Sequence, residues 1–348
     1  LLYGPDYRLE SSEAYKDDSV FIYVQMELCN YSLSYWLNEN KNPSSRDLPR
    51  MMRWFKQLVQ AVGYIHSKNM IHCDLKPKNL LFTNKDTLKL CDIGRASELQ
   101  KDINEWKTEK SRSLIESELY RSPELLIERD GVSSKTDVFS LGLILTELCV
   151  VMTSEERSEI FDEYRNGLQT EKNIDATTAN FVRAFTQVEP SNRPTCTEIL
   201  AQMFEIEVIN ESILLNEQTD SMDTTPILNK PSTLVRGFSS KFVNEFVVRK
   251  IIGEGGYGCV FRTINRNDRY VYAVKRVEVD SNHYETAVRE VQAMAKLRHD
   301  GIVSYKVAWK ESPPEGWQYE SDIDMLKGLG LPRNHLKSMK YYDGSVYI

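Results

Sequence analysis

Three polar side chains, Asp74, Lys76 and Asn79, lie close together in the stretch Ile71–Asn79. An aspartate can accept the proton of an attacking hydroxyl group, and the amide oxygen of an asparagine suits a hard cation such as Mg²⁺. A further carboxylate, Asp92, follows the apolar segment 88–90. Each feature alone would be typical of a turn. Their order and spacing together favour one site in which a base, a cation and a metal ligand act on the same reacting group.

A glycine-rich segment, residues 253–260, separates two strand-like segments. Glycine lets the backbone approach phosphate groups because no Cβ stands in the way. The glycines at regular spacing are Gly253, Gly255 and Gly258. A tight hairpin would also explain them, but Lys275 then ends the apolar segment 272–275. The two motifs together favour phosphate binding over a solvated lysine, and the strand after the loop argues against a dinucleotide-binding fingerprint, which would open a helix.

Length and composition limit the class of protein. A chain of 348 residues is too long for one ordinary core and predicts two units of roughly 150 residues. Hydrophobic residues make up 41% and charged residues 27%, which is typical of a globular protein and excludes collagen, mucin and wholly disordered chains. The formal net charge of -7 provides no general basic surface, so we expect no nucleic-acid partner.

The six cysteines form no CxxC pair, and the histidines form no metal-ligand cluster. This usage predicts reduced thiols and a cytoplasmic location. The longest apolar run, 138–152, is short for a membrane span and contains Glu147, so we expect a buried core helix and no membrane segment in this chain. No signal peptide opens the chain, and Leu1 in place of methionine leaves open that a longer protein contains it.

The segments that must position these side chains fall into two groups. Alternation and helical periodicity predict a first group of strands over 20–26, 80–82 and 88–90 and helices over 47–66 and within 137–206. Residues 207–235 are polar and acidic with two prolines, which is typical of a linker. The second group contains predicted strands over 246–252, 260–264, 271–277 and 302–309, and a helix over 284–297.

These motifs resemble those of the protein kinases. His72–Asp74 with Asn79 is similar to the catalytic loop, and Asp92–Gly94 is similar to the metal-binding DFG motif. Ser122–Glu124 resembles the motif that closes the activation segment, and Asp137–Gly142 resembles the start of the buried central helix. The resemblance covers nearly all of the chain except the linker and the termini. It implies an α+β fold of the bilobal protein-kinase type.

The resemblance also implies a division of the chain in an unusual order. Residues 1–206 would form the hinge strand and the mainly α large lobe, and residues 207–235 the linker. Residues 236–348 would form the β-rich small lobe, which comes first in protein kinases. A circular permutation and a fragment cut from tandem kinases both remain open. Tyr15–Ile22 and Tyr341–Ile348 are identical at five of eight positions, which favours the tandem fragment because a simple permutation would not repeat a strand start.

The resemblance implies an enzyme that transfers the γ-phosphoryl group of ATP to a serine or threonine hydroxyl, with ATP and Mg²⁺ bound. Asp74 would orient the acceptor hydroxyl, and Lys76 would neutralise charge on the transferred group. Asn79 and Asp92 would hold Mg²⁺. Phosphoryl transfer requires mainly positioning and electrostatic stabilisation, and these residues offer both.

Nucleotide-binding roles follow from the same resemblance. Lys275, held by Glu290, would contact the α- and β-phosphates. The adenine would lie below Val260 and Ala273, with Met26 as the gatekeeper residue.

At the hinge, the backbone of Glu27 and Cys29 would contact the adenine. In the large lobe, Arg193 would pair with Glu124.

Three segments, 24–29, 289–297 and 308–318, are similar to the PKR-like ER kinase group, which phosphorylates the α subunit of translation initiation factor 2. That subunit is therefore the expected protein partner, and a homodimer is one option that the resemblance offers. The competing hypothesis is a non-catalytic, pseudokinase-like regulator or decoy. The complete set of polar catalytic residues favours catalysis.

Three positions depart from the kinase pattern. Cys73 replaces the arginine that attracts a phosphate on the activation segment, so we expect activity to depend little on phosphorylation of that segment. Ile93 takes the middle position of the DFG-like motif and can still pack as an apolar plug. Ser117, preceded by Glu116, stands where a glycine-threonine pair is usual, which puts substrate positioning in doubt.

Overall fold

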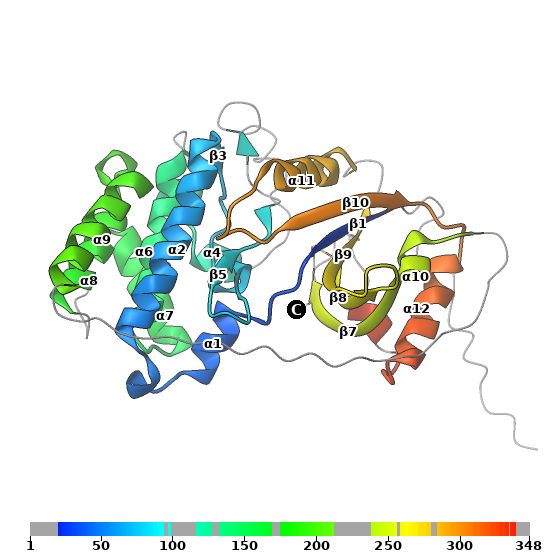
Figure 1. The fold of residues 1–348 in the computed structure, drawn as a ribbon. Coiled ribbons are helices and arrows are strands. Elements are labelled where there is room, and N and C mark those ends of the chain that lie inside the picture. The colour runs from blue at the N-terminus through cyan, green and yellow to red at the C-terminus, as the bar shows by residue number, and fades with distance from the viewer. Residues whose placement is uncertain are drawn as a thin grey trace, which may run out of the picture.

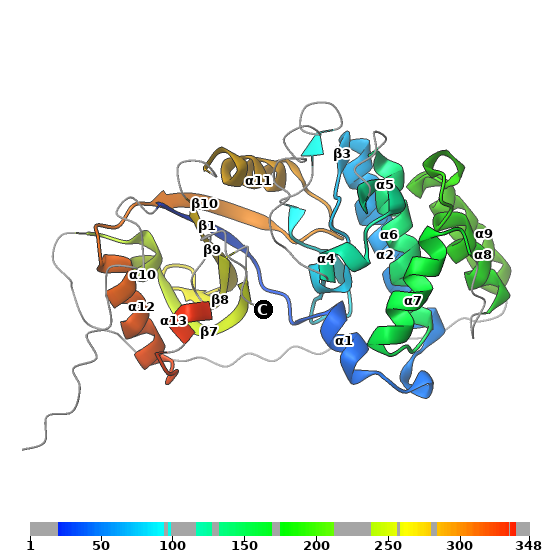
Figure 2. The same cartoon turned by 180° about the vertical axis from the view of Figure 1, so that it is seen from behind.

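The computed structural model describes residues 20–93, 97–98, 116–126, 132–168, 175–211, 238–255, 258–279, 284–333 and 335–338. In these residues a mainly helical part and a part built on a five-stranded sheet lie side by side (Figures 1 and 2). This arrangement confirms the predicted α+β, bilobal fold.

Two long helices form the centre of the helical part. Helix α2 (Leu48–Ser67) starts after Asp47 with a proline in its first turn and buries one apolar stripe, close to the predicted 47–66. Helix α6 (Ser134–Cys149) begins with a capping box in which Ser133 and Thr136 satisfy each other's backbone N–H groups. Nearly every side chain of α6 is buried, so it is the core helix that the apolar run predicts.

Further elements surround these two helices. The other elements of the helical part are β2 (Tyr31–Ser32), α1 (Leu33–Glu39), η1 (Pro43–Ser45), β3 (Met70–Ile71), η2 (Pro77–Asn79), β4 (Leu80–Phe82), β5 (Leu88–Leu90), β6 (Ser97–Glu98), α4 (Glu116–Leu119), α5 (Pro123–Leu126), α7 (Ser154–Arg165), α8 (Ala176–Phe185), η4 (Pro190–Asn192) and α9 (Cys196–Glu211). The predicted strands over 80–82 and 88–90 are confirmed as β4 and β5, which pair with each other.

The five-stranded sheet draws its strands from both ends of the chain. Its order is β10-β1-β9-β8-β7, and all neighbours are antiparallel. The strands are β1 (Val20–Glu27), β7 (Phe246–Gly255), β8 (Gly258–Asn265), β9 (Val271–Val279) and β10 (Tyr305–Glu311). Strand β1 lies between β9 and β10, with Val24 opposite Lys275 on one side and Ala308 on the other. The sheet is therefore complete only with a strand from the start of the chain.

The back of this sheet is covered by helices that the sequence did not indicate, α10 (Lys241–Glu245), α12 (Trp317–Gly328) and α13 (His335–Ser338). Rings from the strands and α10 stack there, with Tyr23 between Phe242 at 5.0 Å and Trp309 at 5.2 Å. Helix α11 (Tyr284–Lys296) agrees with the predicted helix over 284–297. It lies close to β10 (Figure 1).

Two predicted boundaries are wrong. Strand β10 starts at Tyr305 rather than at Ile302, because the backbone of 301–303 bonds across to the helical part: the N–H of Leu90 donates to the Gly301 carbonyl and that of Val303 donates to the Leu90 carbonyl. Helix α9 runs to Glu211, five residues into the expected linker. The repeated segments 15–19 and 341–348 and the rest of that linker lie outside the described residues. The division into lobes at those boundaries therefore stays a prediction.

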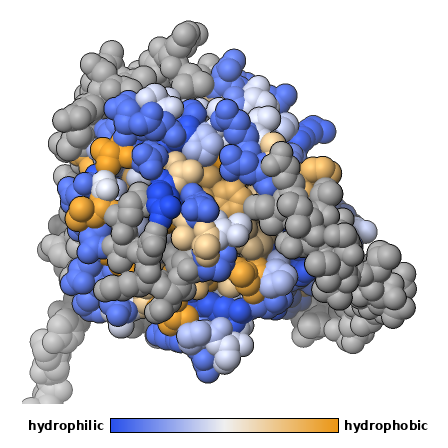
Figure 3. Space-filling view, turned by 90° about the vertical axis from the view of Figure 1, so that its left-hand side faces the viewer, coloured by the Kyte–Doolittle hydropathy of each residue, from blue (hydrophilic) through white to orange (hydrophobic). Residues whose placement is uncertain are grey.

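Two surface properties complete the description. None of the helices in the described part of the chain combines the length and the apolar character needed to cross a lipid bilayer. Seen from the end formed by α8 and α9, the face is largely hydrophilic, with apolar residues gathered near its centre (Figure 3). This end includes Phe204 of α9, which is 61% exposed.

Candidate active site

The loop 72–79 is anchored by a buried carboxylate of helix α6. Asp137, at the start of α6, accepts hydrogen bonds from the backbone N–H groups of His72 at 2.8 Å and Cys73 at 2.9 Å. It also bonds the ring of His66 at 2.8 Å. Burial alone would raise the pKa of Asp137, but the bond and charge of His66 outweigh burial and lower it. Asp137 therefore fixes the loop while it remains ionised.

This anchor explains an unusual backbone conformation. Cys73 has a positive φ of 60°, which costs energy for a residue other than glycine. The two hydrogen bonds to Asp137 stabilise that conformation. From the sequence, Asp137 is predicted to start the buried central helix, with no role in the site. The available signal was a carboxylate at the head of an otherwise apolar helix, which must find buried donors.

Within the loop, three predicted site residues converge. The Lys76 ammonium group lies 3.0 Å from Oδ2 of Asp74. The amide nitrogen of Asn79 donates to the Asp74 carbonyl at 2.9 Å and to its carboxylate at 3.2 Å. All three side chains are buried. Because the amide nitrogen of Asn79 is engaged, its amide oxygen is the atom left for a metal ion.

Backbone bonds bring the segment 91–92 to the same loop. The N–H of Cys91 donates to the Asn79 carbonyl at 2.9 Å, and a ring nitrogen of His72 lies 3.3 Å from the Cys91 carbonyl. Asp92 follows with a positive φ of 58°. These bonds connect the two predicted metal ligands, Asn79 and Asp92, through adjacent backbone.

Lys275 reaches this cluster from the sheet. Its ammonium group lies 3.1 Å from Oδ1 of Asp92, although 183 residues separate them in the sequence. Burial alone would raise the pKa of Asp92. The charge and hydrogen bond of Lys275 outweigh burial, so the pKa lies below its ordinary value. The side chain of Glu290, the expected partner of Lys275, lies outside the described residues, so that pair stays a prediction.

The sheet places the expected nucleotide contacts on one face. Val260 and Val24 lie directly opposite Lys275 on the two neighbouring strands, and Ala273 lies opposite Met26. Directly opposed residues of antiparallel strands point to the same face. The predicted adenine contacts and the predicted phosphate lysine therefore share the face that carries Lys275 toward Asp92.

The glycine-rich loop closes between β7 and β8. Gly253 lies opposite Val260 and Gly255 lies opposite Gly258. Gly258 has a φ of +97°, and a Cβ there would meet the Arg276 carbonyl at 2.1 Å. Glycine at this position is thus required by the close approach of β9, in addition to any role toward phosphate.

The hinge prediction can be narrowed to particular backbone groups of Glu27 and Cys29. The N–H of Glu27 donates to the Ser304 carbonyl at 3.0 Å, so it cannot serve an adenine. The Glu27 carboxylate accepts from Lys89 at 2.7 Å and from the Ser304 N–H at 2.6 Å. Among the hinge groups considered, the Glu27 carbonyl and the Cys29 N–H remain candidates. Burial, and then the charge of Glu27, raise the pKa of the Cys29 thiol to about 12 despite Lys89.

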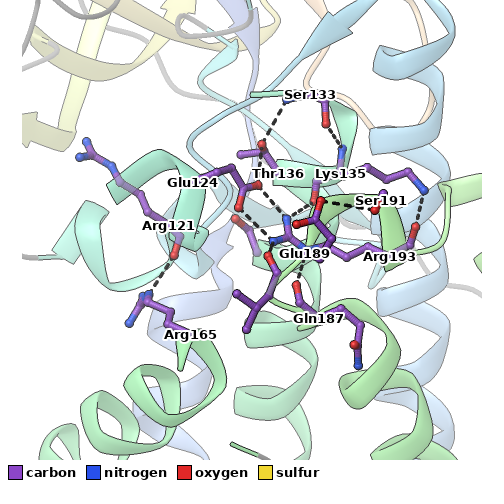
Figure 4. A network of polar contacts seen from close by, with 12 residues as sticks. Arg121, Glu124, Ser133, Lys135, Thr136, Arg165, Gln187, Glu189, Ser191 and Arg193 are labelled. Atoms are coloured by element: carbon purple, nitrogen blue, oxygen red, sulfur yellow. Dashed lines mark hydrogen bonds and ion pairs between the residues drawn. The ribbon is translucent and has the colours of Figure 1, made fainter. Parts of the chain in front are cut away.

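The motif that closes the activation segment is held by the predicted ion pair. Arg193 contacts the two carboxylate oxygens of Glu124 at 2.7 and 2.9 Å, and Thr136 donates to the same carboxylate at 3.0 Å (Figure 4). The Arg193–Glu124 prediction is confirmed. The side chains of Glu116 and Ser117 lie outside the described residues.

The donor set fits a magnesium ion. Mg²⁺ typically takes one or two protein carboxylates and completes its shell with waters and substrate phosphates. Asp92 provides an ionised carboxylate and Asn79 an amide oxygen. In the described ranges no three His, Cys, Asp or Glu side chains gather into a metal cage. A site of this kind would rely on a nucleotide for its remaining ligands.

Comparison with known families identifies the class of protein. The protein kinase domain matches residues 9–204 and 246–320, which is more than half of the chain. The chain therefore belongs to the protein kinase family, whose members are phosphotransferases that use ATP and a divalent metal ion. The two matched segments correspond to the helical part with β1 and to the rest of the sheet.

Similar proteins include several named protein kinases. The chain is 33% identical to the interferon-induced, double-stranded RNA-activated protein kinase of Rattus norvegicus, over 55% of this chain and 36% of that protein. It is 32% identical to the eukaryotic translation initiation factor 2-alpha kinase pek-1 of Caenorhabditis elegans, over 54% of this chain and 19% of that protein. It is 31% identical to the eukaryotic translation initiation factor 2-alpha kinase 3 of Bos taurus, over 59% of this chain and 19% of that protein. The matched regions thus span well under half of these relatives.

Proposed function

We propose that this chain is a catalytic serine/threonine kinase domain that transfers the γ-phosphoryl group of ATP. The observation that carries the proposal is the assembly of Asp74, Lys76, Asn79, Asp92 and Lys275 into one connected cluster. Lys275 and Asp92 come from distant parts of the sequence and meet at 3.1 Å. A stable fold alone would not require polar groups of these types at one point.

Each residue of the cluster has a distinct role in the proposed reaction. Asp74 accepts a hydrogen bond from the substrate hydroxyl and takes its proton, and Lys76 stabilises the charge that develops on the transferred group. Lys275 holds the α- and β-phosphates in place. Asn79 and Asp92 would hold Mg²⁺, which when bound neutralises phosphate charge. Asp137 keeps the loop in its conformation through the backbone of His72 and Cys73.

The proposed protein substrate is the α subunit of translation initiation factor 2. The names of the similar nematode and bovine kinases support this substrate, and so do the segments 24–29, 289–297 and 308–318. We place the reaction in the cytoplasm. The cysteines are all free, as expected for a reducing compartment. A role in regulating translation under stress follows from that substrate.

The test is phosphoryl transfer by the purified chain with Mg²⁺ and labelled ATP. The translation factor subunit, the same subunit with its serines and threonines replaced by alanine, and a general kinase substrate serve as acceptors. We expect labelling of the first and none of the second. Lys275→Met is the inactive control.

The outcomes separate the parts of the proposal. Labelling of the general substrate but not of the subunit would keep the kinase assignment and reject the substrate. Tight binding of ATP·Mg without transfer to any acceptor would reject catalysis and favour a pseudokinase-like regulator. Failure to bind ATP·Mg at all would reject the nucleotide site.

A further inference from the structure

The backbone just before Glu124 is fixed by side chains over four consecutive residues. Helix α4 is a single turn, so its last carbonyl groups have no partners within the helix. The carbonyl groups of Glu118, Leu119 and Arg121 all accept hydrogen bonds from Arg165. The Tyr120 carbonyl between them accepts from the hydroxyl of Ser140 at 2.8 Å. This segment therefore has little freedom to move without breaking side-chain bonds.

Arg165 makes these contacts from the last residue of α7. Its Nε donates to the Arg121 carbonyl at 3.0 Å, and one terminal nitrogen donates to the carbonyls of Glu118 and Leu119. The other terminal nitrogen donates to Asp162 at 2.7 Å, which orients the guanidinium. The Arg165 side chain is only 9% exposed. In Figure 4 Arg165 reaches the Arg121 backbone, whereas the Arg121 side chain points away from it.

The same segment is tied to the helix that anchors the catalytic loop. Ser140 and Glu147 both belong to α6, and the Tyr120 hydroxyl donates to Glu147. Asp137 of α6 holds the backbone of His72 and Cys73. The segment 118–121 and the loop that carries Asp74 are thus positioned by one rigid element.

We propose that Arg165 is a positioning residue that holds segment 118–121 in the shape that receives the protein substrate. The inference rests on the proposed kinase function and adds the means by which its substrate is positioned. Cys73 offers no cation with which a phosphorylated activation segment could pair. The guanidinium of Arg165 on α7 instead bonds the backbone of 118–121, so these four residues need no phosphate to be held in place.

The test compares Arg165→Leu and Arg165→Lys with the matched control Arg53→Leu, which removes an exposed arginine on α2. Arg165→Leu should speed hydrogen exchange at the amides of 118–121 in the absence of substrate. It should raise the KM for the protein substrate by about tenfold, equivalent to one hydrogen bond to a charged group, and leave the KM for ATP within about twofold. For Arg165→Lys, the exchange rate at 118–121 and the KM for the protein substrate should lie between those of the wild type and Arg165→Leu, because an ammonium group can still reach some of the carbonyls.

Asp162→Asn provides a second variant if Arg165→Leu does not fold, because Asp162 is exposed and only orients the guanidinium. It should also speed hydrogen exchange at 118–121 and raise the KM for the protein substrate, but by less than Arg165→Leu does. Exchange at 118–121 equal to that of the Arg53→Leu control would overturn the proposal, as would a KM for ATP that rises in step with that for protein. A wild-type chain that phosphorylates no acceptor would reject the kinase function, while hydrogen exchange would still decide the role of Arg165. Phosphatase treatment of the wild type should leave both KM values unchanged, and a large rise in the KM for protein would contradict the proposal.

Discussion

Lys275 and Arg276 are neighbours on β9, yet their two ion pairs have different character. The Lys275 ammonium group lies 3.1 Å from the carboxylate of Asp92, and these side chains are 9% and 20% exposed. Arg276 makes two contacts with the carboxylate of Asp322 on α12, at 2.7 and 2.9 Å, and these side chains are 1% and 2% exposed. The alternation of a strand sends the two cations to opposite faces of the sheet.

The surroundings of each pair explain the difference. The Arg276 guanidinium lies over the rings of Phe21 and Phe261, at 5.6 and 5.2 Å from their centres, and Gln318 also bonds Asp322. In the proposed reaction, by contrast, Asp92 would bind a metal ion and Lys275 would exchange its contact with Asp92 for phosphate oxygens. A bidentate, almost fully buried pair stabilises one structure, whereas a partly exposed pair can change partners.

The largest expected effect comes from breaking the first pair. Lys275→Met and Asp92→Asn should each abolish measurable ATP turnover, a loss of at least about 100- to 1,000-fold, because charge stabilisation in the transition state is removed. Turnover and thermal unfolding should be measured together, with Lys306→Met on β10 as the exposed control. Near wild-type turnover in either variant would show that its residue has no part in the reaction.

The second-largest effect is expected from separating the two halves of the chain, which breaks one ion pair and leaves the other intact. The Lys275–Asp92 pair joins residues from two halves, whereas the Arg276–Asp322 pair lies within one. Residues 1–211 and 238–348, expressed separately, should each fail to bind ATP·Mg, and a mixture should recover binding by calorimetry. Binding by either piece alone would contradict the shared site. If the whole chain bound ATP·Mg only when it formed a dimer, the halves would pair between chains.

Breaking the second pair should affect stability rather than chemistry. Arg276→Met leaves the Asp322 carboxylate buried without its cation, which should lower the free energy of unfolding by about 3–5 kcal/mol. Replacing both residues, as in Arg276→Met with Asp322→Leu, should recover most of that loss. Denaturant unfolding gives the values. A single variant as stable as the wild type would mean that water reaches this pair.

The smallest expected effect is on the stability of the folded chain at acidic pH. The pKa of Asp92 is lowered in the folded chain, so the stability that its charge contributes should be complete above about pH 5 and lost as the pH falls below about 4, the ordinary value. The melting temperatures of the wild type and Asp92→Asn should therefore differ by a constant amount from pH 8 to 5. A difference that already changes between pH 7 and 6 would show that the pKa is raised instead.

The sequence predicts best those elements whose pattern is local. The helix over 284–297 and the strands over 80–82 and 88–90 follow from spacing alone. The cluster at Asp74, Asn79 and Asp92 follows from motif order, because each residue lies beside a strand or turn that its neighbours define.

Features that depend on a distant partner were missed. Helix α12 has no strong apolar stripe, and its Asp322 pairs with Arg276. Its Ile323 and Leu326 also pack in the apolar cluster behind the sheet. The start of β10 depends on the backbone bonds of 301–303 to Leu90. The positioning role proposed for Arg165 depends on carbonyl groups at and just after the end of α4. The partner of Lys275 illustrates both cases. The contact of Lys275 with Asp92, from the other half of the chain, was not predicted. The predicted pair of Lys275 with Glu290 stays a prediction, because that side chain lies outside the described residues.

The position of β1 has a consequence for how the protein is made. Val24 pairs with Ala308, a separation of 284 residues, so this inner strand emerges from the ribosome long before either neighbour. At about 5–20 residues per second, β1 would wait roughly 15–60 s for its sheet. During that time an apolar strand with Phe21, Ile22 and Tyr23 stays exposed on the nascent chain. Successful synthesis should therefore depend on molecular chaperones that hold this strand until translation ends.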